Sequence, residues 1–361
     1  MRKLNRKWAI FTVTSLGAIF CATLGGAASN SVGTLTAVEG EVILLSRPSK
    51  KFSNTTPPPV MYEGEYFQSQ LAQVGMHVEK GNVLRTTLQG RARVIYENGD
   101  QFNVAPGTAY RIDWQEKLDA KSNAKSKNFE TRMELLHGKI RGIIDKAGPR
   151  NQLRIRTRAA VIGIRGTDFT INCEGAENKT EVSILRGAVE VRSVAQTQSA
   201  PKGAATATKT PDKAQPKTEV RIIRAGEIGI VTASTPVIAP KVEIRRTTQE
   251  ELISSQRIAE IETKSSDIAT TKAVSELEQK AKEVTLRDIK THDPKLFAQI
   301  QANPQKATSL NEINAVSVTQ AYKTAPKAPP FAPTTPQGKP QGSELDRGDQ
   351  DIYKKYFKDL K

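Results

Sequence analysis

One short pattern recurs along the chain: a glycine separates two segments in which apolar and polar residues alternate. It is clearest in TEVSILRGAVEVRSV at 180–194 and TEVRIIRAGEIGIVT at 218–232, and shorter forms occur at 36–45 and 133–144. Such alternation is typical of strands that bury one face. The glycine permits a tight turn that residues with a side chain rarely adopt. The pattern therefore predicts a mainly β fold of short strands, built as solenoid coils or as a meander, rather than a βαβ sheet.

Two interpretations of this pattern stay open. The segments are either repeats of one β unit or independent glycine-turn hairpins of the kind found in many β proteins. Residues 33–46 predict a strand, a turn at Gly40 and a second strand. Asn98-Gly99 lies between two apolar segments, which is a strong signal for a two-residue hairpin.

Three polar stretches predict loops, at 46–59, 116–128 and 195–217. The last of these contains no aromatic residue and no apolar residue except alanine, so it cannot bury enough surface to order itself. We therefore expect one β domain over 29–246, with its core at about 74–192 and these loops as flexible segments.

The periodicity changes after residue 246. Apolar residues at helical spacing predict an α-helical segment over 247–291, and Thr247 with Glu250 or Thr248 with Glu251 could form a capping box at its start. Residues 292–361 contain eight prolines between 294 and 340, which predicts an extended Pro/Lys-rich tail. The end of that tail could form one short amphipathic helix and serve as a docking peptide, with Ile352, Tyr356, Phe357 and Leu360 on one side.

Residues 1–28 have the pattern of a secretion signal: a basic start, an apolar stretch and small residues before a cleavage point after Ala28. An uncleaved membrane anchor is the alternative, and cleavage would leave no transmembrane span. The chain carries 54 Lys and Arg against 38 Asp and Glu, and without the four basic residues of the signal its net charge is +12. This charge either attracts anionic partners such as lipid head groups and cell-wall polymers or serves solubility. Cys173 is then the single cysteine, so no internal disulfide can form.

The sequence lacks the common motifs of catalysis. It contains no phosphate-binding loop, no dinucleotide-binding fingerprint and no Gly-x-Ser-x-Gly turn. The three histidines are far apart and have no metal-ligand spacing around them. Basic residues are spread out, without aromatic residues between them, so charge alone would favour nucleic acid. We therefore expect no enzyme activity, no cofactor, no metal site and no nucleic-acid partner.

The stretch RAAVIGIRGTDFTI at 158–171 is the strongest local feature. Thr167 and Asp168 have no recognisable base, nucleophile or metal partner, so a structural role is favoured over a catalytic one. Gly163 and Gly166 would let the backbone bend or let another strand approach. We expect Thr167 and Asp168 to bond local amides at the bend, while Arg165 either pairs with Asp168 or faces solvent.

These residues resemble the FecR domain family over about residues 74–192. The family motifs are a Gly-Asp-x-Leu-x-Thr start, a Gly-x-Ala strand, a glycine hairpin, a Gly-x-Arg-Gly-Thr-x-Phe signature and a closing Leu-x-Gly-x-Val. In this chain they fall, with Asp168 inside the signature, on Gly81, Leu84, Arg85, Thr86, Gly90, Ala92, Gly99, Asp100, Gly163, Arg165, Gly166, Thr167, Phe169, Leu185, Gly187 and Val189. Asn82 replaces the usual acid, and Arg158 stands where the family often has proline.

The resemblance implies a periplasmic, solenoid-like β domain without enzyme activity. In transmembrane members, a cytoplasmic segment controls a sigma factor and the periplasmic part contacts an outer-membrane receptor. Only eight residues precede the apolar stretch here, so we expect the stand-alone exported type without that segment. The expected function is that of a periplasmic binding module, scaffold or adaptor in the cell envelope. Two alternatives stay open: an accessory component of cell-surface signalling with a separate transmembrane partner, and a binder of anionic cell-wall or lipid polymers.

Overall fold

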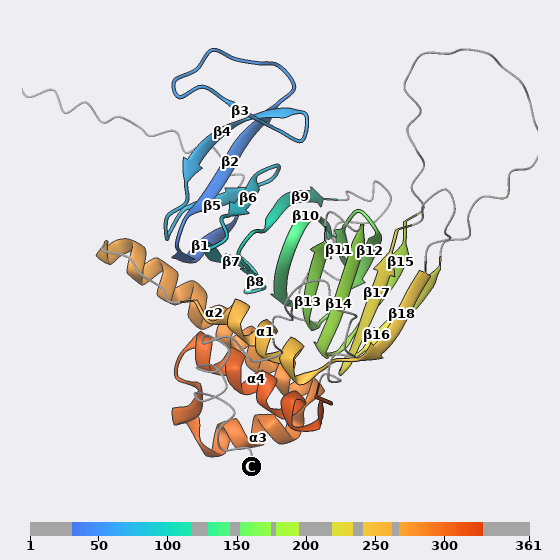
Figure 1. Cartoon of the computed structure of the whole chain (residues 1–361). Helices are drawn as coiled ribbons and strands as arrows, with labels where there is room; N and C mark the ends of the chain where they lie inside the picture. Colours follow the sequence, from blue (N-terminus) through green and yellow to red (C-terminus); the bar gives the residue numbers. More distant parts are fainter. Residues whose placement is uncertain are drawn as a thin grey trace, which may run out of the picture. The chain divides into compact units, whose positions relative to one another are not determined.

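The structure is a computed structural model that describes residues 31–116, 129–144, 152–174, 178–194, 219–233, 241–261 and 267–327 (Figure 1). Several predicted segments lie outside these residues. They are the secretion signal at 1–28, the loop at 195–217, all but the first residue of the loop at 116–128, and the docking residues Ile352, Tyr356, Phe357 and Leu360. Everything described below belongs to one compact unit that begins at Ser31.

The prediction of a mainly β fold is confirmed, because strands form most of the described chain from 31 to 246. The strands are β1 (Ser31–Glu39), β2 (Val42–Ser49), β3 (Val60–Tyr62), β4 (Glu65–Leu71), β5 (His77–Glu79), β6 (Val83–Thr86), β7 (Arg91–Tyr96), β8 (Gln101–Val104), β9 (Ala109–Glu116), β10 (Phe129–Ile143), β11 (Gln152–Arg156), β12 (Ala160–Ile164), β13 (Asp168–Glu174), β14 (Lys179–Arg186), β15 (Ala188–Ser193), β16 (Val220–Arg224), β17 (Glu227–Thr232) and β18 (Lys241–Arg246). The loop predicted from residue 46 begins later, since β2 continues to Ser49 and pairs with β4 there.

The strand pairings form two sheets. Sheet A has the order β5-β1-β7-β8-β10-β13-β14-β17-β18. Sheet B has the order β3-β4-β2-β6-β9-β10-β11-β12-β15-β16. All pairings are antiparallel except that of β10 with β11, which is parallel. One hydrophobic core joins the two sheets, with Leu35, Phe102 and Phe169 from sheet A and Leu44 and Tyr110 from sheet B.

The recurring glycines mark corners between the two sheets. Gly40, Gly138, Gly187 and Gly226 all have positive φ, between 65° and 88°. The chain passes from sheet A to sheet B after β1 and after β14, and it returns to sheet A after β16. Within β10 the passage occurs at Gly138 itself: residues 129–137 pair in sheet B and residues 138–143 in sheet A.

At all four segments these corners rule out the hairpin interpretation. The two arms of each segment lie in different sheets, so they do not pair with each other; Gly187 and its counterparts turn the chain sideways instead of reversing it. The hairpin predicted at Asn98-Gly99 does form, between β7 and β8.

Four α-helices follow the strands: α1 (Gln249–Ala259), α2 (Ile268–His292), α3 (Pro294–Ala302) and α4 (Leu310–Thr324), with a 3₁₀ turn, η1 (Pro304–Ala307), before α4. The capping box predicted for Thr248 and Glu251 is present at the start of α1. No helix in the described ranges is long and apolar enough to span a bilayer.

The prediction of an extended tail from residue 292 is wrong for residues 294–324, where α3, η1 and α4 lie. Only two of the eight prolines of that region precede residue 325, and both occupy the first turn of a helix. Proline is tolerated there because the amides of the first turn have no hydrogen-bond partner within the helix. Ser309 and Glu312 form a capping box, and Leu310, Ile313 and Val318 are buried. The proline content of residues 292–361 as a whole therefore gave a wrong prediction for residues 294–324, because most of these prolines follow residue 325.

Candidate functional site

The outer face of sheet A, which points away from the core, carries a row of polar side chains. The row crosses five strands through Arg93, Asn103, Arg141, Thr170 and Ser183, each paired with the next in register. Such residues usually face water, but all five are buried. The helices lie along this face of the strands (Figure 1), and α1, α2 and α4 provide the hydrogen-bond partners described below. The outer face of sheet A is therefore an interface between the sheet and the chain's own helices.

Arg93 on β7 joins three helices through one guanidinium. Its Nη1 lies 3.1 Å from Oε1 of Glu278 on α2. Its Nη2 donates to the carbonyl of Ala259 at the end of α1, at 2.7 Å, and to Oδ1 of Asn311 on α4, at 2.5 Å. Burial lowers the pKa of Arg93, and the charge of Glu278 offsets only part of this effect.

Asp168, in the Gly-Thr-Asp stretch, lies between two buried arginines. Arg141 on β10 binds its carboxylate in two places, with Nε 2.9 Å from Oδ1 and Nη2 2.8 Å from Oδ2. Arg186, its register neighbour on β14, places Nη2 3.0 Å from Oδ2. The side chains of Asp168 and Arg141 are fully buried, so each charge depends on the other for compensation.

A second acid continues this line into α2. Arg186 Nε lies 2.6 Å from Oδ2 of Asp288, and Oδ1 of Asp288 lies 3.0 Å from Nδ1 of His292. Burial raises the pKa of Asp288, but the charge of Arg186 and the hydrogen bond to His292 lower it further, so it lies below its ordinary value. The same hydrogen bond raises the pKa of His292. We call Arg141, Asp168, Arg186, Asp288 and His292 the buried charge line.

The buried charge line fastens helices to sheet A. Arg141 also donates to the carbonyls of Ser255 on α1 and Asn314 on α4, both at 3.4 Å, and to Oγ of Ser317 at 3.1 Å. Asp168 lines neither the hollow beside Arg154 and Glu190 nor the hollow beside Lys139 and Arg257. Among the described residues, no three His, Cys, Asp or Glu side chains are placed to hold a metal ion.

The Arg-Gly-Thr-Asp corner is packed against a second glycine turn. Gly166 and Gly187 both have positive φ, and a Cβ on Gly187 would lie 2.6 Å from Cγ2 of Thr167. Arg165 is exposed, which decides between its two expected positions. The expected bonds to local amides are not found: Asp168 binds the arginines, and the buried hydroxyl of Thr167 has no hydrogen-bond partner among the described residues.

The other motif residues are spread over both sheets. Gly81 has positive φ in the turn before β6, and Gly99 has it in the β7–β8 hairpin. Leu84 and Thr86 are buried on β6, and Thr86 Oγ1 donates to the carbonyl of Ala105 at 2.6 Å. Phe169 is buried in the core. The structure thus brings only Gly166, Thr167, Asp168 and Gly187 together with the buried charge line.

The outer face of sheet B is open over its last four strands. Its side chains form two register rows, one through Arg156, Val161, Arg192 and Val220 and one through Arg154, Gly163, Glu190 and Ile222. Between them lies a shallow hollow of about 540 Å³ with Arg165 at its border. Gly163 has ordinary φ, and a Cβ there would meet nothing closer than 3.8 Å, so folding does not require glycine at this place.

Sequence reasoning missed Arg141, Arg186 and Asp288. Both arginines directly precede a glycine and follow an apolar residue within the recurring pattern, so each is a charge inside an apolar arm. Asp288 follows Ala281 and Val284 at spacings of seven and four, which places it in the apolar stripe of its helix. The sequence therefore did contain a signal for these three residues: each is a charged residue at a position where the pattern predicts a buried one.

Comparisons with known proteins give one family match and two similar solved structures. A family model described as FecR protein matches residues 82–190. Two crystal structures of a "putative anti-sigma factor" from Parabacteroides distasonis ATCC 8503 are similar to the chain, with identities of 15% and 14% and a TM-score of 0.32 each. They match 48% and 49% of this chain, and the chain spans 64% of the length of those proteins. No curated protein matches the chain.

Proposed function

We propose that the protein is an exported, non-enzymatic adaptor that binds another protein of the cell envelope, because its residues 82–190 match the model of the FecR family. The FecR family supports a role in cell-surface signalling. Within that role, the adaptor would work with a separate transmembrane protein. The secretion-signal pattern at 1–28 supports its location outside the cytoplasm.

One observation carries this proposal: the two outer faces of the FecR domain differ in what covers them. The face of sheet A is closed by the chain's own helices, whereas the described residues leave the face of sheet B open, with its hollow and its arginines. A partner could therefore bind to the open face of sheet B without any rearrangement of the fold.

The non-enzymatic part of the proposal is supported by the Gly-Thr-Asp stretch. Its acid, Asp168, is fully buried and shared between two arginines, which leaves it no access to a substrate. The charges beside it serve the contact between sheet and helices, and this structural use explains why they are there.

Export and binding can be tested in one experiment with the full chain. A photo-crosslinking amino acid is placed at Arg192 on the open face, and in a second variant at Ile268, an exposed residue of α2. We expect the protein in the periplasmic fraction and a discrete adduct with an envelope protein from position 192 only. Retention in the cytoplasm would overturn export, and equal adducts from both positions would overturn the assignment of the open face.

A further inference from the structure

Strand β16 is the last strand of sheet B and has one free edge in the described part of the chain. It pairs with β15 through a register that runs from Ala188 with Arg224 to Arg192 with Val220. No other described strand pairs with it. Its exposed apolar side chains, Val220 and Ile222, are 48% and 53% accessible, which is unusual for an edge strand because such edges invite further pairing.

The backbone of β16 has hydrogen-bonding groups directed away from its neighbour. The carbonyl of Glu219 accepts from Ser193, and the amide of Ala225 donates to Gly187, so odd-numbered residues face β15. In an antiparallel ladder the even-numbered residues then direct their amides outward. The carboxylate of Glu227 accepts the outward amide of Arg224, at 2.8 Å. The outward groups of Val220 and Ile222 remain for a partner.

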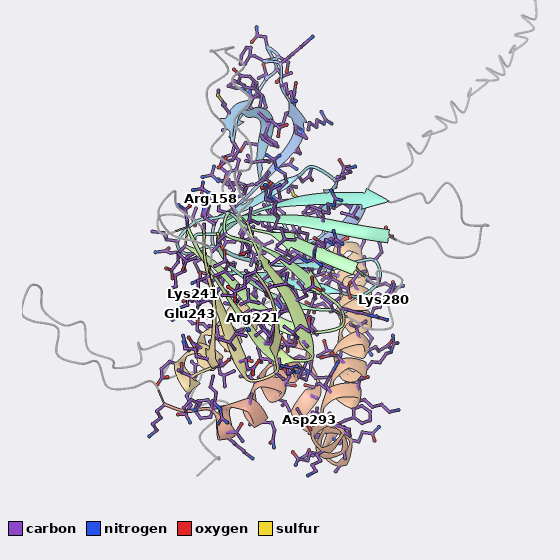
Figure 2. The ribbon with its side chains drawn as sticks, turned by 90° about the vertical axis from the view of Figure 1, so that its right-hand side faces the viewer. Arg158, Arg221, Lys241, Glu243, Lys280 and Asp293 are labelled. Atoms are coloured by element: carbon purple, nitrogen blue, oxygen red, sulfur yellow. The ribbon has the colours of Figure 1, made fainter. Side chains whose placement is uncertain are left out.

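Strand β18, the end of sheet A, shows how the same chain protects an edge. Its side chains alternate in charge, and Lys241 pairs with Glu243 at 2.7 Å (Figure 2). The outward amide of Val242 donates to the carboxylate of Glu219, at 3.0 Å. Charged side chains and capped amides discourage strand addition. Each edge has one capped outward amide, Val242 on β18 and Arg224 on β16. The edges differ in their side chains, because β18 carries ion-paired Lys241, Glu243 and Arg245, whereas β16 exposes apolar Val220 and Ile222.

The charge on the open face beside β16 is positive on balance. The face carries Arg154, Arg156, Arg165, Arg192 and Arg224. The acids near them are fewer: Glu190 pairs with Arg192 at 2.5 Å, Glu134 is the register neighbour of Arg156, and the carboxylate of Glu227 lies at the edge of β16. On β16 itself, Arg221 pairs with Glu219. A second copy of this chain would bring arginines against arginines if it paired through the same edge, which is unfavourable.

We propose that β16 is the docking edge for an extended acidic segment of an envelope protein, which adds to sheet B as a further antiparallel strand. The segment's backbone pairs with the outward groups of Val220 and Ile222. On the outer face it presents apolar side chains to those two residues and acidic side chains to Arg192 and Arg224. This inference rests on the proposed function as an adaptor and names the chemistry of its partner.

The test measures binding of a defined probe to the full chain by fluorescence anisotropy. The probe is a labelled peptide of repeated Glu-Thr-Val-Thr, which alternates acidic and apolar residues on one face of a strand. The comparison peptide has Lys in place of Glu. We expect binding of the acidic peptide only, and an affinity that falls as salt is raised from about 0.05 M to about 0.5 M. Polyphosphate serves as a competitor that is anionic but cannot form a strand.

Two proline variants separate edge pairing from general damage. Ile222→Pro removes an outward amide from β16 and leaves the ladder to β15 intact, because proline is tolerated on the outer side of an edge strand. Ile244→Pro makes the same change on β18, where even-numbered residues also point outward. We expect Ile222→Pro to weaken peptide binding by about tenfold or more and Ile244→Pro to leave it unchanged. Circular dichroism and thermal unfolding verify that both variants are folded.

A charge variant completes the test. Arg192→Glu should weaken binding of the acidic peptide several-fold, while Arg246→Glu on β18 should have no effect. Equal effects of the two prolines, or equal binding of the lysine peptide, would overturn strand addition at β16. Displacement by polyphosphate with no response to Ile222→Pro would assign the face to anionic polymers instead. If these assays fail while position 192 still crosslinks in the periplasm, the adaptor function stands and only the strand mechanism is wrong.

Discussion

The outer faces of the two sheets come from similar alternating sequence patterns, but the face of sheet A is covered by helices and the face of sheet B is open. On sheet A, the row from Arg93 through Arg141 is buried under three helices, and its arginines bind acids and carbonyls at 2.5–3.4 Å. On sheet B, the row from Arg156 through Arg192 faces outward. The difference shows that an arginine in a β pattern does not by itself indicate a solvent face. Its role depends on whether another part of the chain supplies the matching acids.

The matching acids explain which face the helices cover. Glu278 and Asp288 of α2 each reach a buried arginine of sheet A. On the outer face of β11, β12, β15 and β16 the arginines outnumber the nearby acids, Glu190 and the register neighbour Glu134 of β10. Burying this face under a helix of this chain would therefore leave guanidinium groups uncompensated. The positive face therefore stays available for an acidic partner, as proposed for β16.

The largest effect should come from the centre of the buried charge line. Asp168→Asn removes the negative charge between Arg141 and Arg186 and leaves two buried cations facing each other. We expect the free energy of unfolding to fall by about 3–5 kcal/mol, as for a broken buried ion pair. Chemical denaturation measures this, with Glu190→Gln on the open face as the control, for which the loss should stay below ~1 kcal/mol. Similar losses for the two variants would contradict the distinction between the faces.

A smaller effect is expected from two glycines that lie in strands without positive φ. A Cβ on Gly142 of β10 would meet the ring of Phe169 at 2.4 Å, whereas a Cβ on Gly163 of β12 would meet Glu190 at 3.8 Å. Gly142→Ala should therefore destabilise by about 1–3 kcal/mol through overpacking, and Gly163→Ala should be nearly neutral. Thermal unfolding of both variants compares the packed inner side of sheet A with the open side of sheet B. A strongly destabilised Gly163→Ala variant would show that the hollow is filled.

The strand content could be predicted from the sequence, but which face of each sheet the helices cover could not. Alternation and glycines predicted the β domain, Asn98-Gly99 predicted its hairpin, and Thr248 with Glu251 predicted the start of α1. The corners at Gly138 and Gly187 could not be distinguished from hairpins, because both need the same positive φ. Alternation also gives no information on what lies beyond the outer face. The partners that Arg93 has in the helices lie between 166 and 218 residues away in the sequence, so local patterns could not reveal them.

A third prediction concerns how firmly the cover of sheet A is attached. The hydroxyl of Thr248 accepts from the amide of Glu251, and the Glu251 carboxylate accepts from the amide of Thr248 in return. Thr248→Ala should cost about 1 kcal/mol, because it leaves amides of the first turn without a partner. Hydrogen exchange should show faster exchange in α1 and unchanged exchange in β12 and β15, since those strands belong to sheet B. Faster exchange throughout the molecule would mean that the cover and the sheets unfold as one unit.

The smallest expected effect is a pH dependence that belongs only to the covered face. His292 is bonded to Asp288, with Arg186 behind that carboxylate and Asp293 next in the chain, and the bond raises the pKa of His292 above its ordinary 6.5. A raised pKa means that the protonated ring stabilises the folded state: the contribution is complete below pH 6.5 and is lost as pH rises through the folded pKa. The free-energy difference between wild type and His292→Gln should therefore be larger at about pH 5.5 than at about pH 8.5. His77→Gln, on exposed strand β5, controls for histidine replacement as such. An equal difference at both pH values would show that protonated His292 does not contribute to holding α2 on sheet A.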